Sequence, residues 1–230
     1  MRRRNIEGVL LDVDGTLIDS NDAHAQSWCD ALAEFGRKDV WFEDVRPLIG
    51  MGGDKLLPQL LGVDAESKEG RAFSKRRGEI FREHYVPHLR LTPGARELLE
   101  RFRREGLRLT IATSAEKSEL EVMLRQVGLD ELIERKTSSD DVDNSKPDPD
   151  VVRAALRKSD LPAESVLMLG DTPYDVEAAT RAGVGSVALL CGGWNADALG
   201  DALAIYEDPA DLVRQFTASP FSCVVSNPDK

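Results

Sequence analysis

The chain has 230 residues, 41% hydrophobic and 31% charged, a composition typical of a soluble globular protein. Asp plus Glu total 41 and Lys plus Arg total 30, so the net charge of −11 argues against a nucleic-acid binder, which would carry a basic face. No apolar run approaches the length of a membrane span. Three scattered cysteines, without disulfide or metal-ligand spacing, indicate a reducing compartment. We therefore expect a cytoplasmic protein with neither nucleic acid nor membrane as its partner.

Near the N-terminus, a short apolar segment runs directly into a pair of aspartates. Residues 9–11 are Val, Leu and Leu, which indicates a buried strand, and Asp12, Asp14 and Gly15 follow. Side chains two apart on a strand point to one face, so both carboxylates would share a small space. Such a pair is unfavourable unless a cation compensates it or one carboxylate holds a proton, which suits Mg²⁺. Taken alone, the pair also fits a strand end with solvated aspartates.

After this strand the apolar residues recur at helical spacing. One helix is expected over 21–36, and further helical pieces over 56–61 and 73–85. The whole stretch, roughly 70 residues, is too long for a strand-to-helix loop. It therefore predicts a small all-helical cap domain over 18–88, with a hinge at its exit, residues 86–89.

In the remainder of the chain, strands and helices alternate. A helix is expected to begin at Thr92-Pro93 and to end near Gly106. The other expected strands are 107–112, a short one beginning at 132–133, 165–169, 186–190 and 204–206, and the other expected helices are 115–127, 148–159, 173–182 and 209–216. This alternation predicts an α/β fold, a Rossmann-like doubly wound parallel sheet with helices on both faces. The core would comprise 1–17 and 89–217, and 218–230 would be a loose tail.

Polar residues follow several of the expected strands, at the edge where open parallel sheets bind ligands. Thr113 and Ser114 come after one strand and before a helix N-terminus, which suits a phosphate group. Asp171 and Asp175 follow another strand, and Lys146 lies in a turn that precedes a helix. Each of these residues alone also fits a helix cap, a turn or a solvated surface position. Their shared place at matching strand ends favours a single site.

Four ordered motifs resemble those of the haloacid dehalogenase superfamily. They are Asp12-Val13-Asp14-Gly15-Thr16-Leu17, Thr113-Ser114, Lys146-Pro147 and Gly170-Asp171-Thr172-Pro173-Tyr174-Asp175. The resemblance extends over the chain up to about Phe216. A helical cap inserted just after the first motif is similar to the branch that contains phosphoglycolate phosphatases and β-phosphoglucomutases.

The resemblance implies a catalytic role for the residues of the first three motifs. Asp12 would be the nucleophile that takes the phosphoryl group as an aspartyl phosphate. Asp14 would protonate the leaving oxygen and then deprotonate the attacking water. Thr113 and Lys146 would hold the transferring phosphoryl group, and Ser114 would add a phosphate contact.

The resemblance also implies a magnesium site. Mg²⁺ would be bound by Asp12, by the backbone carbonyl of Asp14 and by Asp171. Asp175 would order a metal-bound water or the side chain of Lys146. These residues are the metal ligands and supporting groups that we expect.

The reaction class depends on two further positions. Because the residue two positions after Asp12 is an acid, Asp14, the resemblance implies rapid turnover of the phosphoenzyme. Gly53 occupies the position at which mutases of this branch carry an arginine. We therefore expect a Mg²⁺-dependent phosphatase for a small phosphorylated metabolite, such as phosphoglycolate or a sugar phosphate, acting as a monomer. The alternatives are a β-phosphoglucomutase-like phosphomutase and a non-catalytic, Asp-phosphorylated regulatory domain. In the cap, His24 and Lys55 are candidate substrate contacts, and each also fits an ordinary helix-face or surface position.

Overall fold

A parallel β-sheet is the central element of the computed structural model, which describes residues 5–133 and 135–222. Within these residues the sheet has six strands in the order β5-β4-β1-β6-β7-β8, and every neighbouring pair is parallel. The strands are β1 (Gly8–Leu11), β4 (Arg108–Ala112), β5 (Arg135–Thr137), β6 (Val166–Gly170), β7 (Gly185–Leu189) and β8 (Ala204–Tyr206). The predicted doubly wound α/β fold is confirmed.

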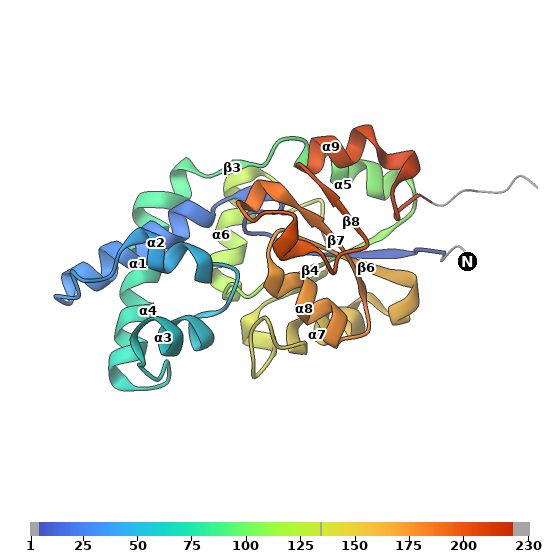
Figure 1. Cartoon of the computed structure of the whole chain (residues 1–230). Coiled ribbons are helices and arrows are strands. Elements are labelled where there is room, and N and C mark those ends of the chain that lie inside the picture. Colours follow the sequence, from blue (N-terminus) through green and yellow to red (C-terminus); the bar gives the residue numbers. More distant parts are fainter. Residues whose placement is uncertain (1–4, 134, 223–230) are drawn as a thin grey trace, which may run out of the picture.

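Helices cover both faces of the sheet because its strands are apolar on both faces. Val9 and Leu11 of β1 belong to one hydrophobic cluster, and Leu10, which points the other way, belongs to a second. In Figure 1, α5 and α9 lie above the sheet, and α7 and α8 lie below it. The helices of the core are α5 (Ala95–Arg104), α6 (Lys117–Val127), α7 (Asp150–Ser159), α8 (Pro173–Arg181) and α9 (Pro209–Arg214).

The insertion after the first motif is helical and lies at one end of the sheet (Figure 1). Its helices are α1 (Asn21–Glu34), α2 (Phe42–Val45), α3 (Gly53–Leu61) and α4 (Lys68–Ile80), followed by helical turns at Phe81–Tyr85 and Val86–His88. The cap has its own hydrophobic cluster, which includes Trp28, Leu56 and Phe73. This separate cluster fits the predicted cap, although the boundaries 18–88 stay a prediction.

The two ends of the cap meet in a small antiparallel ladder. β2 (Ile18–Asp19) at the entrance pairs with β3 (Arg90–Leu91) at the exit. The entrance of the cap and the segment just after the predicted hinge at 86–89 therefore lie side by side. Within the described part of the chain, no helix has both the length and the apolar character that crossing a bilayer requires.

Two predicted element boundaries in the core are wrong. The short strand expected to begin at residues 132–133 lies further along, at β5, and residues 131–132 form a turn. The helix expected to begin at Thr92-Pro93 begins at Ala95 instead, because Gly94 adopts a left-handed conformation with φ of 78°. The hydroxyl of Thr92 does not cap that helix but donates to the backbone carbonyl of Thr16, at 2.7 Å. This contact ties the cap's exit to the first motif.

The predicted loose tail is wrong for its first residues. Residues 216–218 form a helical turn, and Phe221 is fully buried against the core. The ring of Phe221 lies 4.8 Å from that of Phe102 on α5, in an edge-to-face arrangement. Phe221 is a single large apolar residue among small residues and a proline, so no apolar periodicity in the sequence marks this anchor. Residues 223–230 of the predicted tail lie outside the described residues.

Replacing Phe221 with Ala should lower the free energy of unfolding by about 3–5 kcal/mol, since a buried phenylalanine is lost from a packed core. The matched control is Leu203→Ala, because Leu203 is 56% exposed, and its loss should change stability by less than about 0.5 kcal/mol. Urea unfolding followed by circular dichroism measures both. Equal stability of the Phe221→Ala variant and the wild-type protein would contradict the packing of this segment.

Candidate active site

The C-terminal ends of three adjacent strands bring the predicted catalytic residues together. β1 lies between β4 and β6, so Asp12 after β1 lies between Thr113 after β4 and Asp171 after β6. Lys146 enters from the loop before α7 and has no exposed surface. All four side chains are buried at this edge of the sheet.

The buried ammonium of Lys146 bridges two carboxylates. Its Nζ lies 2.5 Å from Oδ1 of Asp12 and 2.7 Å from Oδ1 of Asp175. Burial opposes the charged form of Lys146, but the two carboxylates prevail and raise its pKa above the ordinary value. Asp175 is itself held by Thr172, whose N–H and hydroxyl both donate to Oδ2 of Asp175 in the first turn of α8. The lysine is therefore fixed from both sides.

An acidic cluster surrounds this lysine. Asp12, Asp171 and Asp175 each offer an oxygen, and these oxygens lie within 4.8 Å of one another. Burial, reinforced by the charge of Asp175, raises the pKa of Asp171 to about 7. Burial likewise raises the pKa of Asp12 well above its usual value, although Lys146 opposes the shift. One lysine does not balance three buried carboxylates, so the residues present fit a hard divalent cation with oxygen ligands.

Two neutral side chains hold the carboxylate of Asp171 in place. The hydroxyl of Thr16 donates to Oδ1 at 2.7 Å, and the amide of Asn21 donates to Oδ2 at 2.9 Å. Gly192 lies so close that a Cβ there would come within 1.8 Å of Oδ2, which leaves no room for a side chain. Thr16 belongs to a motif found in the sequence, whereas Asn21 and Gly192 gave no signal of their role.

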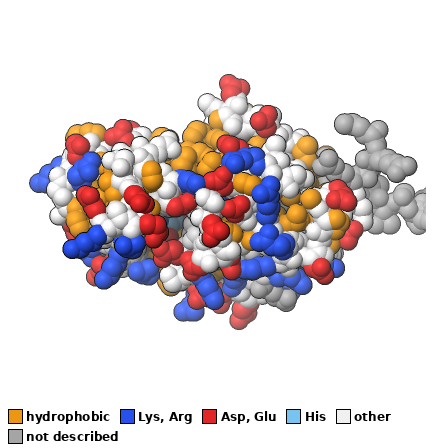
Figure 2. Space-filling view, turned by 90° about the horizontal axis from the view of Figure 1, so that it is seen from below, with side chains coloured by type: hydrophobic (Ala, Val, Ile, Leu, Met, Phe, Trp, Pro, Cys, Tyr) orange, Lys and Arg blue, Asp and Glu red, His pale blue; other side chains and the backbone are white. Residues whose placement is uncertain are grey.

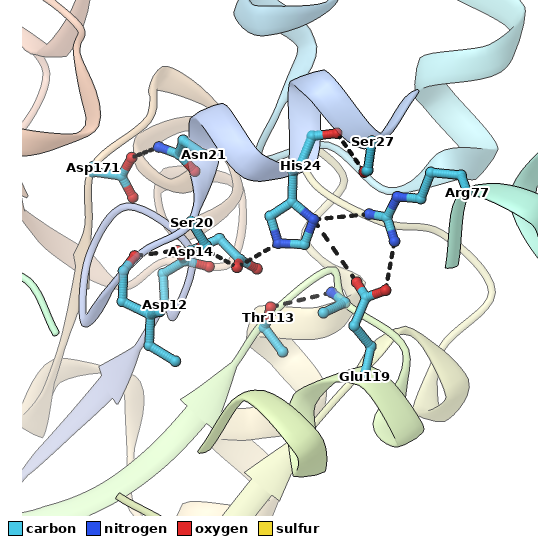
Figure 3. A network of polar contacts seen from close by, with 12 residues as sticks. Asp12, Asp14, Ser20, Asn21, His24, Ser27, Arg77, Thr113, Glu119 and Asp171 are labelled. Carbon is cyan, nitrogen blue, oxygen red and sulfur yellow. Dashed lines mark hydrogen bonds and ion pairs between the residues drawn. The ribbon is translucent and has the colours of Figure 1, made fainter. Parts of the chain in front are cut away.

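Asp14 lies close to Asp12 but in a different environment. The chain turns at Gly15, where φ is 76°, and the carboxylate of Asp14 faces the cap (Figure 3). Its Oδ1 accepts hydrogen bonds from Ser20, at 2.5 Å, and from Nε2 of His24, at 2.7 Å. Burial raises the pKa of Asp14, but the contacts with His24 and Ser20 outweigh it, so the pKa lies below the ordinary value. The carboxylates of Asp12 and Asp14 are thus set up differently.

The hydroxyls of the second motif are held by backbone groups. Oγ1 of Thr113 accepts from the N–H of Ala115 at 3.1 Å, and Oγ of Ser114 accepts from the N–H of Lys146 at 3.3 Å. Both residues line a cavity of about 690 Å³ between the cap and the core. Their position on this cavity would suit contacts with a phosphate group, and these contacts stay a prediction.

The same cavity is lined from the cap by His24, Trp28 and Arg77 and from the core by Asp12 and Asp14. A small metabolite would therefore meet the carboxylates of the core on one side and the cap on the other.

On the face shown in Figure 2, acidic and basic side chains are interspersed, so this face has no continuous basic surface for nucleic acid.

The structure separates the two candidate substrate contacts of the cap. His24 lines the cavity, but its Nε2 is bonded to Asp14. Lys55 is not among the described residues that line the cavity. Its ammonium pairs with Asp148 of the core at 2.8 Å and approaches Asn144 at 3.4 Å. A substrate contact of Lys55 therefore has no support in this geometry and stays an untested prediction.

Comparisons with known proteins agree with the motifs. The model of the family described as haloacid dehalogenase-like hydrolase matches residues 9–189. A phosphoglycolate phosphatase of Pseudomonas syringae pv. tomato is 30% identical over 188 residues, which cover 80% of this chain and 69% of that protein. A phosphorylated carbohydrates phosphatase of Thermotoga maritima is 28% identical over 180 residues, covering 78% of this chain and 82% of the relative.

A crystal structure of a hydrolase from Pseudomonas syringae has the same fold. It superposes with a TM-score of 0.85 and 32% sequence identity, over 92% of this chain and 98% of that one. The resemblance that the four motifs indicated is confirmed. This chain belongs to the haloacid dehalogenase-like hydrolase family.

Proposed function

We propose that this hydrolase is a Mg²⁺-dependent phosphatase of small phosphomonoesters that works through an aspartyl phosphate on Asp12. The observation that carries the proposal is that the two neighbouring carboxylates, Asp12 and Asp14, have different contacts. Asp12 is held by Lys146 within the acidic cluster, and Asp14 is held by His24 outside it. The names of the relatives, a phosphoglycolate phosphatase and a phosphorylated carbohydrates phosphatase, support these substrate classes for this chain.

Asp12 is suited to attack phosphorus. Lys146 holds one of its carboxylate oxygens, which fixes the direction of the carboxylate and favours its ionised form. The same ammonium would offset negative charge on the transferring phosphoryl group. The hydroxyls of Thr113 and Ser114, which line the cavity, would hold the remaining phosphate oxygens.

The metal would be held by the carboxylates of Asp12 and Asp171 and by the backbone carbonyl of Asp14. When bound, Mg²⁺ neutralises negative charge on the phosphate oxygens and on the carboxylates. The side chain of Asp14 faces the cap, where Ser20 and His24 hold its Oδ1, and its Oδ2 would carry the proton. It would give that proton to the leaving oxygen and later take one from the attacking water, with the cap limiting access of bulk water.

Variants of the two aspartates test this assignment. Asp12→Asn removes the nucleophile, so no covalent intermediate should form. Asp14→Asn keeps the nucleophile but removes the acid and base, and it should slow hydrolysis by about 100- to 10,000-fold. With p-nitrophenyl phosphate, whose leaving group needs little protonation, the phosphoenzyme of Asp14→Asn should accumulate. Intact-protein mass spectrometry after a brief substrate pulse should show one added phosphoryl group on Asp14→Asn and none on Asp12→Asn. Near-normal turnover by Asp12→Asn would contradict the assignment.

Metal binding should depend on pH through Asp171. Its pKa in the metal-free fold is about 7, above the ordinary value of 3.8, so the metal-free fold loses stability as the pH rises between these values. Below pH 7 a proton competes with the cation, and the Mg²⁺ affinity should fall by up to roughly tenfold per pH unit. Differential scanning fluorimetry should therefore show a larger Mg²⁺-induced rise of the Tm at pH 8 than at pH 6.

The control for the metal experiment is Asp171→Asn, which lacks the titrating carboxylate and should show little rise of the Tm at either pH. EDTA should abolish the phosphatase activity of the wild-type enzyme, and Mg²⁺ should restore it. An equal response of the wild-type protein and the variant to Mg²⁺ would exclude Asp171 as a ligand.

The choice of phosphatase over phosphomutase depends on Gly53. A Cβ at this position would meet Ser74 at 3.7 Å and Trp28 at 3.8 Å, which are ordinary contact distances, so a side chain would fit there. Glycine lacks the guanidinium with which an arginine would bind the second phosphate of a bisphosphate. We therefore expect inorganic phosphate to be released from several monoesters, with no conversion between sugar 1- and 6-phosphates. A coupled assay with and without a sugar bisphosphate primer measures both. Primer-dependent interconversion faster than phosphate release would favour the mutase.

A further inference from the structure

A buried carboxylate that belongs to none of the four motifs lies on the core side of the cavity. Glu119, in the first turn of α6, is only 4% exposed. Within the described residues its carboxylate has two charged or titratable partners, and both come from the cap. Its Oε2 lies 2.5 Å from Nη1 of Arg77, and its Oε1 lies 3.9 Å from Nδ1 of His24. Since a buried carboxylate is costly without a cation, Glu119 depends on the cap for its partner.

Arg77, on α4, holds two groups at once. Nη1 donates to Glu119, and Nη2 lies 3.0 Å from Nδ1 of His24. The guanidinium carbon also lies 5.2 Å from the centre of the Phe81 ring and 5.5 Å from that of Trp28, within the range of a cation–π contact. A planar guanidinium has rigidly directed donors, so contact with Glu119 also sets the direction in which it meets the imidazole.

The guanidinium determines which ring nitrogen of His24 carries the proton. Arginine has donors only, so Nδ1 of His24 must accept from Arg77. The proton of the neutral ring is then on Nε2, which donates to Oδ1 of Asp14 at 2.7 Å. The 3.9 Å between Nδ1 and Glu119 is too long for a hydrogen bond, so Arg77 rather than Glu119 sets the tautomer.

These four side chains form one series of contacts that crosses between core and cap (Figure 3). Its ends, Glu119 and Asp14, belong to the core, and its middle members, Arg77 and His24, belong to the cap. Moving the cap away would break both core contacts together. The pair of Lys55 with Asp148 also joins cap to core, but it is partly exposed, and pairs of this kind contribute little.

We propose that Glu119 is a positioning residue of this enzyme. With the cap closed, it holds Arg77 from the core side, and Arg77 in turn orients the imidazole of His24 so that Nε2–H points at Asp14. The proposal rests on the proposed phosphatase function for the role given to Asp14. Closure of the cap and correct placement of the acid and base then become a single event.

The experiment compares Glu119→Gln with Glu121→Gln. Both changes remove one negative charge from α6, but Glu121 is exposed, is not among the described residues that line the cavity, and has no ion pair within the described part of the chain. With p-nitrophenyl phosphate and Mg²⁺, Glu119→Gln should lower kcat by about 10- to 100-fold, as expected for loss of a charged hydrogen bond, with a smaller change in KM. Glu121→Gln should match the wild-type enzyme. Adding Arg77→Met to Glu119→Gln should cause little further loss, because both act through one contact.

Nitrogen-15 spectra of the histidine side chains give a second measurement that does not depend on turnover. The chain has three histidines, so the signal of His24 can be assigned by its loss in His24→Gln. In the presence of Mg²⁺ and AlF₄⁻, the wild-type and Glu121→Gln proteins should show the Nε2–H tautomer, and Glu119→Gln a mixture of tautomers. If Glu119→Gln fails to fold, Arg77→Lys replaces it. Lysine keeps the charge but lacks the fork, so the preference for one tautomer should again be lost.

The results separate the two hypotheses. Unchanged kcat and an unchanged tautomer in Glu119→Gln, or an unchanged tautomer in Arg77→Lys, would overturn the role of Glu119. If the wild-type protein hydrolyses no phosphomonoester, the proposed function fails, whereas the histidine spectra still decide whether Glu119 orients His24.

Discussion

Lys146 is the residue on which the site most depends, because its buried ammonium holds two buried carboxylates together. Asp12 and Asp175 come from distant parts of the chain, and without this cation between them their charges would repel at close range. Burying the charge of a lysine that has no exposed surface costs free energy unless the charge is paired. The pairing therefore fixes the positions of Lys146 and of both carboxylates. The proposed nucleophile is thus held in place before any substrate arrives. Placing such charges so close is possible only because the strand ends and the start of α8 fix the backbone around them.

The parallel sheet explains why residues so far apart in sequence meet. β1 is a central strand with β4 and β6 on either side, so whatever follows these three strands is brought to one edge. The cap closes that edge from the other side and supplies the partner of Asp14. The two aspartates of the first motif therefore differ because Asp12 lies in the acidic cluster around Lys146 and Asp14 faces the cap. Their difference in environment, rather than in sequence, is what suits them to different tasks.

Much of the fold was predictable, because strands buried on both faces appear as apolar runs and helices as a spacing of three to four residues. The errors have local physical causes. Gly94 delays the start of α5 through its left-handed backbone, and Phe221 is a single large apolar residue that anchors its segment without any apolar periodicity around it. The strand expected to begin at 132–133 was displaced because β5 is an edge strand with only one buried residue, Thr137, so hydrophobicity does not mark it.

The site was predictable only where its residues directly follow strands or belong to a motif. Asp12, Thr113 and Asp171 follow three adjacent strands, so the fold alone brings them to one edge of the sheet. Arg77 and Glu119 could not be found in this way, since their contact depends on how the cap docks against the core. The same dependence applies to Lys55, whose pairing with Asp148 of the core could not be foreseen from the sequence.

The ladder between β2 and β3 has a consequence for how such an enzyme can diverge. It brings the two ends of the cap together at one point beside the first motif. Helices between those ends can be lengthened, shortened or exchanged while the sheet keeps its register, because the closing contact is made by four residues outside them. Selection on the range of substrates can then act on most of the cap, whereas the cap residues that contact the core, such as His24 and Arg77, are constrained together with the site. A chain built in this way can change what it recognises while the residues that carry out the reaction stay the same.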